Sequence, residues 1–175
     1  MVRTIEWKEG VVVIIDQTKL PNQVVWVNLR NSDDVASAIK EMKLRGAPLI
    51  GVAAAYGLAL TAFNSKAKKR EDLMKALETS AKILRKTRPT AVNLFWAIDR
   101  GMKKARETAG TTEDLAEAVV AEAQRMADED VEFNRKMGRH GAELIEDGDV
   151  VLTHCNAGSL ATVDYGTALG VVRAA

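Results

Sequence analysis

The pattern of apolar and polar residues changes twice along this chain, and its first part is typical of strands. β-branched runs occupy residues 11–15 and 24–27, and the turn signal Leu20-Pro21-Asn22 separates them. Residues 4–7 precede a break at Glu9-Gly10. Together these runs predict a small antiparallel β-meander.

Beyond residue 30, apolar residues recur at spacings of three and four, which is typical of helices with one buried face. Asn31 or Ser32 is expected to cap the first helix, and Thr112 the last. Pro48 fits the first turn of the second helix, where its missing N–H removes no intrahelical bond. The predicted helical bundle covers residues 33–42, 49–63, 71–86, 91–109 and 112–145.

Residues 47–64 belong to the longest uncharged run of the chain and are 18 residues rich in alanine and glycine. This length reaches the threshold for a membrane-spanning helix. Gly51, Ala54 and Ala55 lie on one side of the run, however, and such small residues favour a helix packed closely against another backbone. We therefore expect a buried helix and no membrane partner.

The pattern changes again at Asp147, where an Asp-Gly turn leads into the apolar run 150–152. A polar loop follows, and an alanine-rich, helix-like segment begins at Gly158. A strand, a tight loop and a helix in this order are how an open α/β sheet begins. We therefore expect two units: residues 1–146, a small β-sheet with helices, and residues 147–175, the first βα unit of a Rossmann-like domain.

Cys155, the only cysteine, lies in the loop of this βα unit between His154 and Asn156. A single cysteine is most often a small buried apolar residue. Beside the N-terminus of the expected helix, however, the positive end of the helix dipole would favour its thiolate. Neighbours in an extended chain point to opposite faces, so His154 is expected to serve packing rather than to pair with the thiol.

Composition narrows the possible classes of function. Hydrophobic residues make up 47% of the chain, and 25 basic residues nearly balance 24 acidic ones, so nothing indicates a broad nucleic-acid-binding surface. One cysteine excludes an intrachain disulfide, and residues 1–7 lack the apolar core of a signal peptide, so we expect a cytoplasmic protein. The acidic residues 128–130 could suggest a metal site, but consecutive acids on a helix point in different directions, which favours a solvated face.

Two arginines share the same local arrangement. Arg45 and Arg88 each lie just ahead of a proline that begins a predicted helix. Backbone N–H groups at a helix start bind anions, and a guanidinium adds a planar fork of donors that suits phosphate. Gly46 would let the backbone approach such a ligand closely. Either arginine alone would suggest only a surface residue near a helix cap, but the pair, together with the Cys155 loop, predicts a site for a phosphorylated small molecule.

Several separated motifs along the chain form one set. They are Glu6-Trp7-Lys8, residues 15–21, Arg45-Gly-Ala-Pro-Leu-Ile-Gly51, Arg88-Pro-Thr-Ala-Val-Asn-Leu94, residues 128–134, Thr153-His-Cys-Asn-Ala-Gly158 and residues 166–173. This set resembles the signatures of the methylthioribose-1-phosphate isomerase family and covers essentially the whole chain. The same superfamily includes ribose-1,5-bisphosphate isomerases and the regulatory subunits of the translation initiation factor that exchanges guanine nucleotide.

The resemblance implies an aldose–ketose isomerase of methionine salvage, which converts 5-methylthioribose 1-phosphate to 5-methylthioribulose 1-phosphate without a metal or organic cofactor. It also implies that Arg45, Gly46, Ala47 and Arg88 bind the substrate and that Cys155 is catalytic. The hydrogen could move from C2 to C1 by proton transfer or by a hydride shift. Two alternatives stay open, namely a regulatory protein-binding relative and a ribose-1,5-bisphosphate isomerase.

The family's chain is much longer than these 175 residues, and its essential aspartate lies beyond the matching part. The resemblance therefore implies that this is a truncated α/β family fold, the N-terminal half of an enzyme and inactive alone. Its partner would be the C-terminal half of the same enzyme, and the complete protein would be a homodimer.

Overall fold

The computed structural model describes residues 2–175, and its chain begins with a three-stranded antiparallel sheet. The strands β1 (Ile5–Lys8), β2 (Val11–Ile15) and β3 (Trp26–Leu29) are ordered β1-β2-β3. Ile5 pairs with Ile14, and Val12 pairs with Leu29. All four side chains are buried, so one face of the sheet packs against the helices. The predicted meander is confirmed, although its third strand starts two residues later than expected.

Six α-helices follow within residues 2–175. They are α1 (Ser32–Lys40), α2 (Ala47–Phe63), α3 (Arg70–Arg85), α4 (Val92–Glu107), α5 (Thr112–Ala142) and α6 (Ala168–Ala174), with a 3₁₀ turn η1 (Ser159–Ala161) before the last. The five predicted helices of the bundle are confirmed, with ends within about three residues of those expected.

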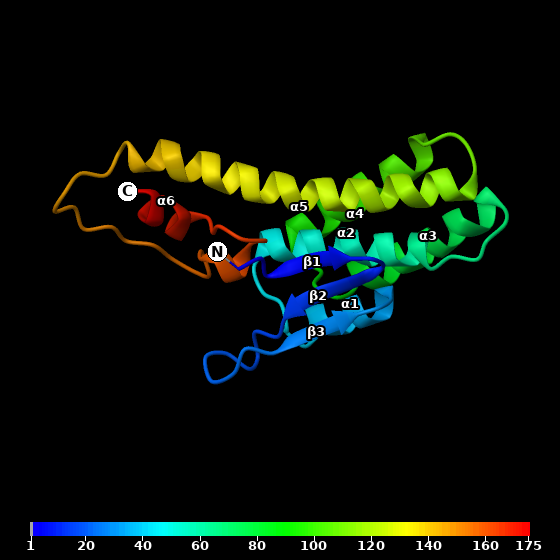
Figure 1. Ribbon diagram of the computed structural model, residues 1–175, viewed down its shortest axis with the longest axis horizontal. Coiled ribbons are helices and arrows are strands. Elements are labelled where there is room, and N and C mark those ends of the chain that lie inside the picture. Colours follow the sequence, from blue (N-terminus) through cyan, green and yellow to red (C-terminus); the bar gives the residue numbers. More distant parts are fainter. Residues whose placement is uncertain (1) are drawn as a thin grey trace.

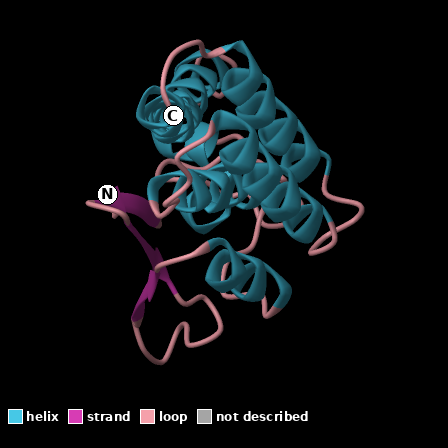
Figure 2. Ribbon diagram, turned by 90° about the vertical axis from the view of Figure 1, so that its right-hand side faces the viewer, coloured by secondary structure: helices cyan, strands magenta, loops and turns pink. Residues whose placement is uncertain are grey.

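The centre of the molecule is α2. It contacts α1, α3, α4 and α5, and thirteen of its 17 residues are buried. A helix that is apolar on all sides belongs inside a protein. Close packing is confirmed at Gly51, where an added Cβ would lie 3.0 Å from the carbonyl oxygen of Asn93 in α4. Figure 1 shows α5 running along the bundle, and Figure 2 shows the sheet at one side of it. None of the helices in residues 2–175 has the length and apolar character that crossing a membrane requires.

The caps of α1 and α5 follow from local sequence. Asn31 caps α1, and its side-chain oxygen accepts the N–H of Asp34 at 2.8 Å. The cap of α5 is Thr111 rather than the predicted Thr112. Thr111 and Asp114 each accept the other's backbone N–H, which forms a capping box. Thr112 could not form this box because the residue three positions beyond it is Leu115, which has no acceptor.

The C-terminal part differs from its prediction. Residues 150–152, predicted as a strand, form no strand, and Val150 and Leu152 are 98% and 95% exposed. The physical reason is that a strand needs a hydrogen-bonded neighbour, and the sheet within residues 2–175 comprises only β1, β2 and β3. The helix predicted from Gly158 is reduced to η1, and α6 begins only at Ala168. The described residues therefore contain no complete βα unit.

The segment from η1 to α6 is nevertheless firmly attached. The N–H of Thr4 donates to the carbonyl oxygen of Val163 at 2.8 Å, and the Thr4 hydroxyl donates to that of Thr162 at 2.6 Å. The N–H of Val163 donates to Asp130 on α5 at 2.8 Å. Figure 1 shows this segment, orange to red, lying beside the blue N-terminus and along the far end of α5.

The acidic residues 128–130 of α5 point to three different partners. Asp128 pairs with Arg3, Glu129 with Arg100 on α4, and Asp130 with the backbone of Val163. The divergence predicted for them is confirmed, but the solvated face is wrong for Asp130, which is half-buried and accepts the N–H of Val163. This burial raises the pKa of its carboxyl. No group of three or more His, Cys, Asp or Glu residues in the described part of the chain is arranged to hold a metal ion.

Candidate functional site

One cavity of about 410 Å³ contains all five residues that the sequence singled out. Its lining consists of Met42, Arg45, Gly46, Ala47, Pro48, Ile50, Arg88, Thr90, Ala91, Cys155, Asn156 and Thr167. These residues come from three separate places in the chain: the start of α2, the turn between α3 and α4, and the loop segment before α6. The fold therefore brings Arg45, Arg88 and Cys155 to a single hollow.

The start of α2 forms one wall. Gly46 is the residue that caps this helix, Ala47 is the first helical residue, and Pro48 lies in the first turn, as predicted. Gly46 supplies no side-chain acceptor, and the first intrahelical bond runs from the N–H of Ile50 to the Gly46 carbonyl at 2.9 Å. Backbone N–H groups ahead of this bond have no partner in the helix ladder, which makes them suitable for an anion.

Gly46 has a different physical role from the one expected. The sequence suggested that its missing side chain lets a ligand approach the backbone. In the structure Gly46 has a φ of +106°, and an added Cβ would lie 2.5 Å from the Cα of Ala161. Glycine is therefore required by the left-handed backbone and by contact with η1. This contact joins the start of α2 to the segment that carries Cys155.

The turn before α4 forms the second wall. The hydroxyl of buried Thr87 donates to the carbonyl oxygen of Leu84 at 2.6 Å, which fixes the end of α3. The carbonyl oxygen of Arg88 accepts the N–H of Ala91 at 3.0 Å and closes the turn. Ala91 caps α4 without a side-chain acceptor. Pro89 thus lies ahead of the helix rather than in its first turn, because the turn between Arg88 and Ala91 delays the helix start to Val92.

The cavity carries uncompensated positive charge. Arg45 is exposed and Arg88 is half-buried, and neither has an ion-pair partner among residues 2–175. No aspartate or glutamate belongs to the described lining. Two guanidinium groups beside one hollow repel each other, and an anion between them would relieve that repulsion while accepting their hydrogen bonds. The arrangement suits a phosphate group.

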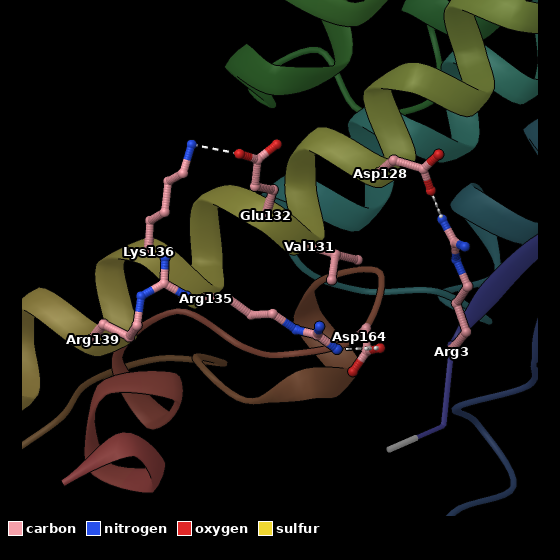
Figure 3. Close-up of a pocket in the computed structure, with 8 residues that line it drawn as sticks. All are labelled: Arg3, Asp128, Val131, Glu132, Arg135, Lys136, Arg139 and Asp164. Carbon is pink, nitrogen blue, oxygen red and sulfur yellow. Dashed lines mark hydrogen bonds and ion pairs between the residues drawn. The ribbon is translucent and has the colours of Figure 1, made fainter.

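A second cavity, of about 430 Å³ along α5, shows the contrast (Figure 3). Its charged groups are largely paired with one another: Arg3 with Asp128 at 2.5 Å, Lys136 with Glu132 at 2.5 Å and Arg135 with Asp164 at 3.8 Å. Because these carboxylates already neutralise most of the cationic charge, this cavity has less need of an outside anion. The cavity that contains Arg45 and Arg88 is the better candidate.

Cys155 lies at the exposed side of the candidate site, next to Asn156 and near Thr167 in the lining. Its φ of +66° is in the left-handed region, which few non-glycine residues adopt. The prediction that a helix begins directly after Cys155 is wrong, since only the three-residue turn η1 follows and α6 begins thirteen residues later. His154 is exposed rather than packed and does not belong to the lining.

Sequence reasoning missed several members of the lining. Thr90, Asn156 and Thr167 lie within the quoted motifs but carried no functional signal of their own. Met42 is the last residue of the predicted helix 33–42, yet it lies beyond the end of α1 and is 43% exposed. No residue-type signal could have revealed this, because methionine rarely adopts its backbone conformation, with a φ of +59°.

Several known proteins are similar to this chain over nearly its whole length. A profile of the initiation factor 2 subunit family matches residues 43–175. The methylthioribose-1-phosphate isomerase of Syntrophotalea carbinolica is 54% identical over 175 residues, which cover 99% of this chain and 51% of that protein. The isomerase of the same name from Geobacter metallireducens is 50% identical over 174 residues, or 99% of this chain and 50% of that protein.

Two solved structures share the fold. The 5-methylthioribose 1-phosphate isomerase of Pyrococcus horikoshii OT3 superposes with a TM-score of 0.93 at 48% identity, covering 99% of this chain and 49% of that one. The translation initiation factor eIF-2B, subunit delta, from A. fulgidus gives a TM-score of 0.89 at 50% identity, covering 99% and 51%. The chain thus spans about half the length of the relatives it matches.

Proposed function

Because this chain belongs to the initiation factor 2 subunit family, we propose that it provides the phosphate-binding wall and the thiol of an isomerase acting on 5-methylthioribose 1-phosphate. The observation that carries the proposal is the shared cavity of Arg45, Arg88 and Cys155, which has two unpaired guanidinium groups and no acidic residue in its described lining. The names and identities of the relatives support the same substrate.

Arg45, Arg88 and the N–H groups at the start of α2 would hold the phosphate. Charge-assisted bonds of this kind are roughly twice as strong as neutral ones, and a bidentate fork also fixes orientation. Gly46 and Ala47 would contribute backbone groups of the helix start, where an anion can bind, rather than side chains. The proposed substrate-binding residues are therefore Arg45, Gly46, Ala47 and Arg88.

The reaction itself is an internal redox change. The bond from C1 to the ring oxygen breaks and that oxygen takes a proton; hydrogen then moves from C2 to C1, and the C2 hydroxyl loses its proton to become a ketone. C1 is reduced and C2 is oxidised, so no outside electron carrier enters the balance. Cys155 would act beside C1 and C2, as a base or as an electrostatic partner.

The described lining contains no carboxylate to protonate the ring oxygen. We propose that this acid comes from the part of the relatives' length that the chain does not cover. We also propose that residues 1–146 form one domain and that residues 147–175 begin a Rossmann-like domain, in which 150–152 becomes a strand once neighbouring strands are present. A cytoplasmic homodimer completes the proposal for the whole enzyme.

A regulatory, protein-binding role is the second candidate, since the solved eIF-2B subunit delta from A. fulgidus shares the fold at 50% identity. A purely structural subunit has no chemical need for two unpaired arginines and a thiol around one cavity. The site therefore favours the isomerase. A ribose-1,5-bisphosphate isomerase would use the same first phosphate site but would need cations for a second phosphate.

The decisive experiment joins residues 1–175 to the part of the Syntrophotalea carbinolica isomerase that lies beyond its match to this chain. We expect this chimera to convert 5-methylthioribose 1-phosphate to 5-methylthioribulose 1-phosphate, and Cys155→Ser to lower kcat by about a hundredfold or more. His154→Ala serves as the matched control, because the imidazole is next in sequence but outside the lining. An inactive chimera that is correctly folded, or a fully active Cys155→Ser variant, would contradict the proposal.

A further inference from the structure

Left-handed backbone is concentrated at the candidate site. Among residues 2–175, three non-glycine residues have a positive φ: Glu9 at +47°, Met42 at +59° and Cys155 at +66°. Met42 and Cys155 both line the cavity, whereas Glu9 lies in the turn between β1 and β2. Conformations of this kind persist where the surrounding structure holds them in place, and they are frequent at functional sites.

The backbone of Met42 is held by the end of α1. The N–H of Met42 donates to the carbonyl oxygen of Ile39 at 3.3 Å, and the N–H of Lys43 donates to that of Ala38 at 2.9 Å. This pair of bonds is the Schellman motif, in which the left-handed position is usually glycine because glycine has no Cβ. Here Met42 occupies this position, so the need to end the helix does not explain why the residue is a methionine rather than a glycine.

Met42 is the most exposed large apolar residue of the cavity lining. It is 43% exposed, whereas Ile50, the other large apolar residue of the lining, is 2% exposed. The remaining apolar members, Ala47, Pro48 and Ala91, are small. A thioether is polarisable and flexible, so it adapts to an apolar ligand group, including another thioether.

We infer that Met42 is a specificity-determining residue that contacts the methylthio end of the substrate and disfavours a second phosphate there. The inference rests on the proposed function. Arg45 and Arg88 are the only cations in the described lining. In the proposed function both would bind the first phosphate. A second phosphate beside the Met42 thioether would lose water without gaining a charged partner, whereas a methylthio group would gain apolar contact.

The test is a calorimetric measurement of Kd on the 175-residue chain for two ligands, 5-methylthioribose 1-phosphate and ribose 1,5-bisphosphate. We expect the unaltered chain to bind the methylthio compound more tightly. The preference is the Kd for ribose 1,5-bisphosphate divided by the Kd for 5-methylthioribose 1-phosphate. Met42→Gly should reduce this ratio about tenfold, in line with the loss of one apolar contact, and Met42→Leu should keep most of the preference. Met42→Gly also relieves the left-handed strain, so it should fold and should raise the Tm.

Glu9→Gly is the matched control, because it relieves the same kind of strain at a turn away from the cavity. It should raise the Tm and leave both Kd values unchanged. If the role of Met42 is purely structural, Met42→Gly changes the Tm but not the Kd ratio. Met42→Gly that binds the methylthio compound with an unaltered Kd ratio therefore overturns the inference and leaves the proposed function standing. If the 175-residue chain alone binds neither ligand, the same ratio is measured on the chimera with the remaining part of the isomerase. Binding of neither ligand by the correctly folded chimera overturns the proposed function, and the inference with it.

Discussion

Gly46 and Ala161 meet backbone to backbone: a Cβ on Gly46 would lie 2.5 Å from both the Cα and the carbonyl oxygen of Ala161. Through this contact the helix start that follows Arg45 is positioned against the segment that follows Cys155. A side-chain hydrogen bond next to this contact reinforces it: the Gln17 amide donates to the carbonyl oxygen of Leu160 at 2.7 Å. The relative position of the guanidinium and the thiol therefore depends on the contact between Gly46 and Ala161.

Gly46→Ala should destabilise the fold strongly. The new methyl group must displace η1, and its residue must also adopt a φ of +106°, so we expect a loss of about 2–5 kcal/mol in the free energy of unfolding by urea. Gly148→Ala is the control, since Gly148 has a φ of +91° but no atom within 4 Å of an added Cβ. It should lose only about 1 kcal/mol. Equal losses for the two variants would contradict the importance of the contact with Ala161.

Arg88→Ala should weaken the binding of 5-methylthioribose 1-phosphate by roughly 10- to 100-fold, because a hydrogen bond to a charged group is worth about 1.5–3 kcal/mol. Arg45→Ala should act in the same direction, and both effects should shrink as salt screens the charge. Calorimetry at two salt concentrations measures this. Arg30→Ala provides a control, since Arg30 is exposed and outside the lining. An equal loss in Arg30→Ala would mean that the effect comes from net charge alone.

The thiol of Cys155 can report on occupancy of the cavity. It is the only cysteine and is exposed, so a maleimide should modify one site per chain. Because Cys155 lines the same cavity as Arg88, bound 5-methylthioribose 1-phosphate should slow the reaction in proportion to the occupied fraction. Arg88→Ala should lose this protection at the same ligand concentration. An unchanged labelling rate under conditions where calorimetry detects binding would place the ligand elsewhere.

Glu129 should stabilise the fold in a pH-dependent way. Its carboxylate accepts two bonds from the Arg100 guanidinium, at 2.5 and 2.9 Å, and this hydrogen-bonded partner holds the pKa of Glu129 below its ordinary value of 4.5. A carboxyl group with a lowered pKa in the folded state contributes stability above its unfolded pKa. That stability is lost as the pH falls through the lowered value.

Glu129→Gln should therefore lower the free energy of unfolding by about 1–2 kcal/mol at pH 7, and the difference from the unaltered chain should shrink as the pH falls below the ordinary value of 4.5. Urea unfolding at several pH values measures it. Glu132→Gln, which breaks the exposed pair with Lys136, should change stability by less than about 1 kcal/mol. A loss for Glu129→Gln that does not vary with pH would rule out titration of this pair.

Features that depend on a few neighbouring residues could be predicted from the sequence. The spacing of Val35 and Ile39 predicts the buried face of α1, and both side chains are fully buried. Asn31 is a good cap because its side chain reaches the N–H of Asp34 three residues on. The cap of α5 was misplaced by one residue, since the choice between Thr111 and Thr112 depends on which of them Asp114 can bond.

Features that depend on contacts between distant segments could only be guessed. Arg45 and Arg88 resemble each other locally, but they share a cavity because Gly51 lets α2 approach Asn93 of α4. The apolar run 150–152 looks like a strand, yet strand formation depends on a neighbour rather than on the run itself. The place of Met42 in the cavity lining could not be predicted for a related reason. Its position depends on where α1 ends and on the direction in which the backbone then turns.

The bonds from Thr4 to Thr162 and Val163 have a consequence for biosynthesis. They join residues 158 and 159 positions apart, so β1 leaves the ribosome long before its partner exists. At roughly 5–20 residues per second this interval lasts about 8–30 s. The helices around α2 can assemble meanwhile from more local contacts, but the hollow between Arg45 and Cys155 cannot close until the last part of the segment has been translated. The ligand site therefore forms after the bundle around α2, which has already had time to fold.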